Sequence, residues 1–433
     1  TQTGFGRTGT VNWITTKKTT DFTAVSGEGY FVDTAAVGAF TLTLPSSPSA
    51  GDIVGLKDYN GNFSTANLTI GRGGSPINGG NAIDPVINTD GASIFLVYVD
   101  ASQGWVATQD DSSTFSGEAF VVATGGTITQ CGNCKIHTFT GPGTFSVTTA
   151  SSNAADNVIS HLIVGGGGGA GSFHGGGGGA GGFREVKSPV TPYTASPLDG
   201  YPSAPNRVTI SASPGSYPIV VGAGGVGKKG PTAPGGPVTN TPGSDSTFAG
   251  LTSTGGGKGG GDTPGVNQAG ATGGSGGGGG NSTSGLSGGA AGGAGNTPSV
   301  SPAQGFAGGS GGSDDTSFRG GGGGGGATAV GTNVNPSGPD SAPDSVGYGG
   351  AGATTSINGT PTARGGGGGG GSTNVSGTGG TGGGGSGGTN PSPTQATAGT
   401  ANTGGGGGGA GDPASGIAGG GGSGIVIIRY KFQ

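Results

Sequence analysis

The sequence predicts an all-β N-terminal part followed by a glycine-rich bundle of polyglycine II helices, which short β-strands close, with essentially no α-helix. The first observation is the distribution of glycine: residues 1–164 hold 22 of the 116 glycines, and residues 165–433 hold the other 94. The second is that the later glycines form contiguous runs. Such runs exclude α-helix, because each glycine in a helix interior costs roughly 1 kcal/mol relative to alanine, and they lack the every-third-residue pattern of collagen.

Residues 1–115 are predicted to form an N-terminal β domain. Short segments rich in aromatic and β-branched residues are separated there by Pro, Gly, Asn and Asp, which is typical of a sandwich or barrel-like fold. In one segment Phe40, Leu42 and Leu44 alternate with threonines. Because successive side chains on a strand point to opposite faces, we expect these three residues in the core.

Residues 116–164 are predicted to form a second β segment, the base of the glycine-rich domain. Its last apolar segment, 158–164, runs directly into the first glycine run. Its apparent partner is the apolar segment 424–432. We therefore predict that residues 165–433 form a glycine-rich domain whose two ends meet at one base, because the strands that flank it pair.

The glycine-rich part has about a dozen glycine-dominated segments, which are separated by loops rich in Pro, Ser, Thr, Asn and Asp. The clearest segments are 165–171, 175–182, 255–261, 273–280, 305–312, 320–326, 365–371, 379–388, 404–411 and 419–424. A disordered chain is one interpretation, since little apolar area offsets roughly 1–2 kcal/mol per residue of backbone entropy. The other is a bundle of threefold extended helices that rise ~3.1 Å per residue, in which only glycine lets six neighbours approach. The similar run lengths favour the bundle, and we expect the Ala and Ser substitutions within the runs on outward faces.

Charge and motifs argue against several classes of protein. The formal net charge is −5, which argues against nucleic acid as a partner. The sequence has no apolar segment of 18 or more residues, so it does not predict membrane insertion. Segment 220–228 matches two phosphate-binding glycine motifs, but Pro and Gly follow it where both motifs require a helix. With only three histidines, no catalytic triad can be argued. We predict no enzyme, no cofactor and no metal site.

Cys131 and Cys134 form a C-x-x-C motif, and they are the only two cysteines. A structural zinc site needs four ligands, and there is no second cysteine pair to supply them. We expect either a local disulfide or two inert thiols.

Several segments resemble bacteriophage virion proteins. The segments 161–171 (HLIVGGGGGAG), 181–185 (GGFRE) and 421–430 (GGSGIVIIRY) resemble the glycine-rich domain of tail-fibre and virion proteins, which is common in phages of marine cyanobacteria. The segments 9–13 (GTVNW) and 27–32 (GEGYFV) resemble modules from the same setting. The glycine-rich half is also similar in kind to the adhesins of T-even-like long tail fibres, which stack polyglycine helices and present variable loops.

This resemblance implies a non-enzymatic virion fibre or adhesin, extracellular, at a tail fibre or at a capsid or tail appendage. Its expected partners are its own chain, as a homotrimer, other virion proteins, and a host outer-membrane protein or surface glycan. The N-terminal domain would serve virion attachment or oligomerisation. The alternative is a structural decoration, appendage or extracellular filament subunit whose loops mediate self-assembly. Ice binding by a flat polyglycine face is a third class, which the irregular loops disfavour.

Receptor binding is expected in the loops, which vary in such adhesins. Long loops at 183–214, 228–254, 327–346 and 389–403 are the preferred positions, because binding residues concentrate in ordered loops on rigid scaffolds. Aromatic residues of the loops throughout the glycine-rich part, with two of their neighbours, are candidates for stacking on sugars or contacting proteins: Phe173, His174, Tyr193, Tyr201, Phe306, Phe318, Arg319 and Tyr348. The alternative is that these side chains cap helix ends or pack between subunits.

Overall fold

The protein consists of two compact units built from β-strands. The computed structural model describes residues 11–108, 119–230, 239–261, 269–282, 289–313, 319–335, 346–389, 395–411 and 416–432. One unit holds Thr1–Val121 and Thr149–Ala154, and the other holds Val122–Thr148 and Ala155–Phe432. In the described residues the helical segments are two short 3-10 turns, Ala154–Asn157 and Ala204–Asn206, so the prediction of an all-β chain is confirmed.

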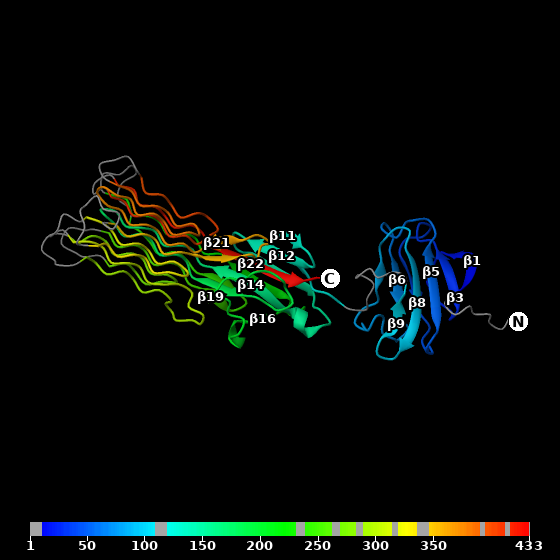
Figure 1. The fold of residues 1–433 in the computed structure, drawn as a ribbon. Coiled ribbons are helices and arrows are strands. Elements are labelled where there is room, and N and C mark those ends of the chain that lie inside the picture. The colour runs from blue at the N-terminus through cyan, green and yellow to red at the C-terminus, as the bar shows by residue number, and fades with distance from the viewer. Residues whose placement is uncertain are drawn as a thin grey trace. The chain divides into compact units, whose positions relative to one another are not determined.

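In the first unit, strands β1 to β6 alternate between two sheets (Figure 1). The five-stranded sheet has the order β1 (Asn12–Lys18), β3 (Glu28–Val32), β5 (Ile53–Asp58), β8 (Ser93–Asp100) and β9 (Gly104–Ala107). The four-stranded sheet has the order β2 (Phe22–Thr23), β4 (Phe40–Thr43), β6 (Leu68–Gly71) and β7 (Val86–Ile87). In both sheets the first three strands are parallel and the later ones antiparallel. The chain therefore crosses from one sheet to the other after each of the first five strands. The short apolar segments of the sequence did not predict this order of strands.

Side chains from both sheets form one core. Phe40, Leu42 and Leu44 are 8%, 0% and 0% exposed, which confirms the expectation drawn from their alternation. They belong to one cluster with Leu56 of the other sheet and with Trp105, which is fully buried.

Two sheets form the base of the second unit. The larger has the order β11 (Thr127–Cys131), β12 (Cys134–Phe139), β22 (Ile425–Lys431), β14 (Val158–Val164) and β15 (Phe183–Val186), with β16 (Val208–Thr209) also paired to β14. The smaller has the order β10 (Val122–Thr124), β13 (Gly143–Thr149), β17 (Ser216–Val220), β18 (Ser246–Phe248) and β19 (Leu251–Ser253). A separate hairpin joins β20 (Ala353–Thr355) to β21 (Thr362–Arg364).

The predicted pairing of the two strands that flank the glycine-rich part is confirmed. β14 and β22 are antiparallel, with Val164 opposite Ile425. Leu162 and Ile427, which also lie opposite each other, are both fully buried. The first glycine run therefore leaves the base beside the point where the last one returns.

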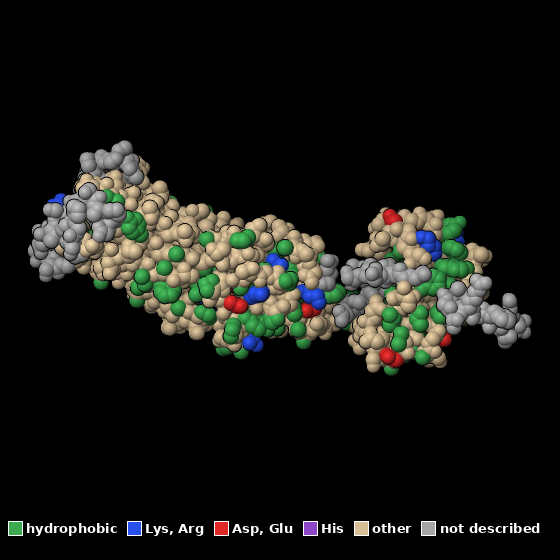
Figure 2. Space-filling view, viewed as in Figure 1, with side chains coloured by type: hydrophobic (Ala, Val, Ile, Leu, Met, Phe, Trp, Pro, Cys, Tyr) green, Lys and Arg blue, Asp and Glu red, His purple; other side chains and the backbone are tan. Residues whose placement is uncertain are grey.

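Beyond the base, the glycine runs pass back and forth beside one another (Figure 1), and the face of the bundle in Figure 2 is mostly backbone and uncharged side chains. Run 165–171 shows the repeat, since every third amide donates to the same neighbouring run, with N···O distances of 2.8–3.0 Å. The runs that accept from it are 239–245, 416–424 and 175–182. The runs that donate to its carbonyls are 255–261, 222–228 and 404–411. This interior run thus bonds six neighbours, as the threefold symmetry of a polyglycine II helix requires.

Close packing explains why these runs are glycine. A Cβ atom on Gly168 would lie 2.2 Å from the carbonyl oxygen of Gly257. Alanines replace glycine at a few positions within the runs. We expected these alanines on outward faces, but those within the interior runs are buried. Ala170, Ala410 and Ala418, at 0%, 3% and 4% exposure, contact one another on adjacent runs. Their methyl groups share one space, which is why an alanine fits there.

Candidate functional site at the loop end of the bundle

The bundle has two different ends, and only one carries the base. At the other end the chain turns at residues 172–174 and 373–375. Isolated β-bridges there join neighbouring runs: Lys229 to Ile417, Ser282 to Ser313, Gly320 to Ser372, and Ser372 to Thr389. We call these turns and bridged residues the loop end. The bridges hold the starts and ends of the loops in fixed positions.

Phe173 and His174 form a fixed turn at the loop end. Both have positive φ angles, +67° and +50°, a conformation that costs non-glycine residues of order 1–3 kcal/mol. His174 is 4% exposed, and its Nε2 lies 3.2 Å from the hydroxyl of Thr373. Its carbonyl oxygen accepts a 3.2 Å bond from the amide of Asn281. The turn therefore joins three separate segments, while the Phe173 ring is half-buried beside His174.

Arg319 also lies at the loop end, with an exposed side chain. Its carbonyl oxygen accepts a 3.3 Å bond from the amide of Thr373. Thr373 therefore contacts both Arg319 and His174, although it was not among the predicted residues. The sequence could not predict that Thr373 lies between them, because Thr373 and His174 are 199 residues apart in the chain. Phe318 lies outside the described residues.

The other predicted residues lie elsewhere. Tyr348 is half-buried on run 346–352, where its amide donates a 2.6 Å bond to the hydroxyl of Thr332. Phe306 is 36% exposed on the flank of the bundle. Tyr193 and Tyr201 belong to the loop that lies against the base.

This base loop, residues 187–207, follows β15. The Arg429 guanidinium of β22 lies 5.3 Å from the centre of the Tyr193 ring, and the Arg207 guanidinium lies 4.3 Å from that of Tyr201. Burial raises the pKa of Tyr193 above its ordinary value, and the charge of Glu185 adds to that rise. Both tyrosines thus pack within the base, away from the loop end.

A buried carboxylate holds the same loop and the β20–β21 hairpin. Glu185 is 1% exposed, and it accepts a 2.8 Å bond from the amide of Ser196 and another from the hydroxyl of Thr355. Burial raises the pKa of Glu185, and these hydrogen bonds oppose the rise. Arg429 donates to the carbonyl oxygens of Pro192 and Ile357 at 2.8 and 3.3 Å. The predicted loop 183–214 is therefore in large part a structural element of the base.

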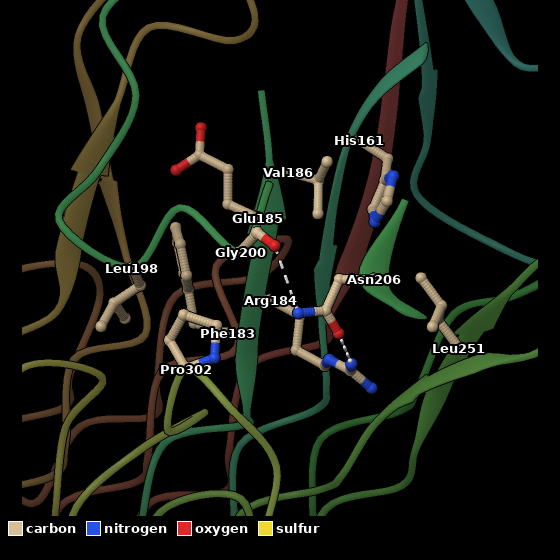
Figure 3. Close-up of a pocket in the computed structure, with 10 residues that line it drawn as sticks. All are labelled: His161, Phe183, Arg184, Glu185, Val186, Leu198, Gly200, Asn206, Leu251 and Pro302. Carbon is tan, nitrogen blue, oxygen red and sulfur yellow. Dashed lines mark hydrogen bonds between the residues drawn. The ribbon is translucent and has the colours of Figure 1, made fainter. Parts of the chain in front are cut away.

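A small cleft lies beside β15 (Figure 3). Arg184 donates to Asn206 Oδ1 at 2.8 Å and to the carbonyl oxygen of Thr252 at 2.9 Å. Glu185 points away from Arg184, as alternation along the strand requires (Figure 3). His161 is 1% exposed, and burial, with the nearby charge of Arg184, lowers its pKa to about 3. Among the residues that line this cleft, we find no nucleophile paired with a base.

The cysteines lie opposite each other across a two-residue turn between β11 and β12. Both are free thiols: Cys134 is buried and Cys131 is half-buried. Burial raises the pKa of the Cys134 thiol, and the nearby Arg429 opposes this rise. Of the two alternatives from the sequence, the structure has the pair of thiols. In the described part of the chain, no three His, Cys, Asp or Glu side chains form a group suited to a metal ion. A search of the same residues for a helix long and apolar enough to cross a membrane finds none.

The fold defines a class of protein, an all-β chain with a polyglycine II bundle that turns at a loop end. Comparison with protein families is consistent with this class, since residues 138–431 match the Glycine-rich domain family. The match covers more than half of the chain, so the chain belongs to that family. It begins within β12 and so includes most of the base as well as the bundle. A search of curated proteins finds no match.

Proposed function

We propose that the protein is a non-enzymatic adhesin of a bacteriophage virion, which binds its host through the loop end. The observation that carries the proposal is that an interior run such as 165–171 bonds six neighbouring runs, so the turns at the loop end are attached to a rigid frame. A rigid frame lowers the entropy lost when loops bind a partner. The resemblance of segments 161–171 and 421–430 to phage virion proteins adds the setting.

Two described side chains at the loop end suit recognition. The Phe173 ring offers an apolar face on which a sugar or an apolar side chain can stack. The exposed Arg319 offers a planar set of donors to carboxylate or phosphate groups of a host surface. The partner we propose is therefore a surface glycan or an outer-membrane protein.

The first unit would attach the bundle to the virion. It has its own strands and its own core, as a separately folding attachment domain needs. By resemblance to phage fibres we propose a homotrimer on the virion surface. The mass of the full chain in solution tests this point: three chains are expected, and a single chain at every concentration contradicts it.

The binding proposal is tested with fluorescently labelled full-length protein on a panel of marine cyanobacteria and other Gram-negative cells. The double variant Phe173→Ala, Arg319→Ala is expected to bind a recognised strain at least about tenfold more weakly, as expected when two central contacts are lost. Tyr201→Ala, an aromatic truncation at the base, is the matched control and should bind like the wild type. Equal binding by the double variant, or no binding to any strain, contradicts the proposal.

A further inference from the structure

The two cysteines meet at one hairpin of the base. Cys131 ends β11 and Cys134 begins β12, and they lie directly opposite each other in the register of these antiparallel strands. Gly132 and Asn133 form the turn between them, with Gly132 at a φ of +58°. A glycine with positive φ at the first position of a two-residue turn is typical of a type II′ hairpin, which holds the flanking residues in register. Both thiol side chains therefore extend from the same face of the hairpin.

The separation of the two strands suits a disulfide. Directly opposed residues of an antiparallel pair have Cα atoms about 4.5–5.5 Å apart. A disulfide joins residues whose Cα atoms are about 4.4–6.8 Å apart. The two sulfurs can therefore bond after rotation of the side chains, without displacement of either strand. Because both thiols are free in this structure, the same hairpin can hold a reduced and an oxidised form of the pair.

The two thiols differ in access and in surroundings. Cys131 is half-buried, and a Cβ atom on Gly359, in the β20–β21 turn, would lie 3.7 Å from its sulfur. A residue larger than glycine would cover the sulfur on that side. Cys134 is fully buried and lies opposite Lys431 of β22. Burial raises the pKa of the Cys134 thiol, and the positive charges of Arg429 and Lys431 oppose the rise, because they stabilise the thiolate.

We propose that Cys131 and Cys134 form a thiol–disulfide exchange site whose substrate is a disulfide of low molecular weight, such as oxidised glutathione. The more accessible Cys131 attacks one sulfur of the external disulfide as a thiolate, forms a mixed disulfide and releases the other half as a thiol. Cys134 then attacks the sulfur of Cys131 and releases the second thiol. Two cysteine thiols are oxidised to one disulfide, and the external disulfide is reduced to two thiols, which take up the two protons. The pair is then neither a permanent disulfide nor two inert thiols.

Incubation of the full-length folded protein with oxidised glutathione, followed by mass spectrometry and thiol titration, tests the proposal. The wild type should lose both titratable thiols and two hydrogen atoms, carry no bound glutathione, and regain both thiols in dithiothreitol. Because the chain has only two cysteines, every change in thiol content belongs to this pair. Cys134→Ser should stop at the mixed disulfide on Cys131, since it lacks the second thiol. Cys131→Ser should react at least about tenfold more slowly than Cys134→Ser, because its remaining thiol is buried.

Several results would overturn the proposal. One is a wild type that keeps both thiols, and another is a wild type that accumulates bound glutathione, since the second thiol would then not reach the first. A disulfide between two chains, or a Cys131→Ser variant that reacts as fast as Cys134→Ser, also contradicts it. Unchanged circular dichroism shows that the variants remain folded. The reaction occurs within one hairpin, and its products are counted per chain, so the result depends neither on binding at the loop end nor on the number of chains in the assembly.

Discussion

Substitution of one interior glycine tests whether backbone packing stabilises the bundle. In Gly178→Ala, the new Cβ would lie 2.0 Å from the carbonyl oxygen of Gly168. Carbon and oxygen atoms of packed chains normally approach to about 3.3–3.6 Å, so the runs must separate by more than about 1 Å. Ala180, two residues further along the same run, is a natural alanine with 0% exposure. The run therefore tolerates a methyl group where space exists, and the cost at Gly178 reflects its position.

The size of the effect follows from the bonds around Gly178. Its amide donates to Gly407 at 2.8 Å, its carbonyl oxygen accepts from Gly368 at 2.9 Å, and Gly407 donates to Gly168 at 3.0 Å. Each of these three bonds contributes a net ~0.5–1.5 kcal/mol, and overpacking of a core costs ~1–3 kcal/mol. We expect Gly178→Ala to lower the free energy of unfolding by about 3–7 kcal/mol. This is a large part of the 5–15 kcal/mol that is typical of whole domains.

Chemical denaturation of the full chain, followed by circular dichroism, measures this loss in the transition of the second unit. The matched control is Gly141→Ala in the base, where a Cβ meets no atom within 4 Å. Gly141→Ala should change the free energy of unfolding by no more than about 1 kcal/mol. The change should be stabilising, because alanine lowers the conformational entropy of the unfolded chain. If Gly178→Ala changed the free energy of unfolding no more than Gly141→Ala does, the interior runs would not be packed as described.

Three further predictions concern the base, the alanine cluster and the thiols. Because the pKa of His161 falls to about 3, the unfolded chain binds its proton first, and stability should fall as pH drops from about 6.5 toward 3, by up to ~1.4 kcal/mol per pH unit. Glu185, whose pKa is raised, acts in the opposite sense: its contribution to the stability of the protein is lost as pH rises from about 4.5 through that raised value. His161→Gln should reduce the fall in stability between pH 6.5 and 3, and an unchanged fall contradicts this. Ala170→Gly should lower the free energy of unfolding by about 1–2 kcal/mol, through a small cavity and added chain entropy; thermal unfolding checks it, and a neutral result argues against the cluster. In the folded protein a thiol reagent should modify half-buried Cys131 faster than buried Cys134, as peptide mass spectrometry would show; equal rates contradict the burial difference.

Much of the architecture could be predicted from the sequence because it depends on composition. The apolar segments 158–164 and 424–432 flank the glycine-rich part, and their pairing follows from that placement alone. The six-neighbour lattice follows from glycine having no side chain. Which run neighbours which could not be predicted, because the glycine runs are nearly alike and carry too little side-chain pattern to fix register.

The candidate site was less predictable. Phe173 and Arg319 lie at the loop end, whereas Tyr193 and Tyr201 pack against arginines of the base. An aromatic residue in a long loop gives the same sequence signal in both cases. The contact of His174 with Thr373 depends on tertiary packing, so neither residue alone indicates it.

Hydrogen–deuterium exchange of the full chain, resolved by peptide, tests the central claim that the glycine backbone forms a bonded lattice. Amides of the interior runs 165–171 and 175–182 should be protected to a degree close to that of β14 and β22, because every one of their neighbours must separate before they exchange. The amide of Gly224, which has no hydrogen-bond partner among the described residues, should exchange much faster. Exchange through the interior runs at the rate of an unstructured peptide would contradict the lattice and remove the rigid frame on which the proposed function depends.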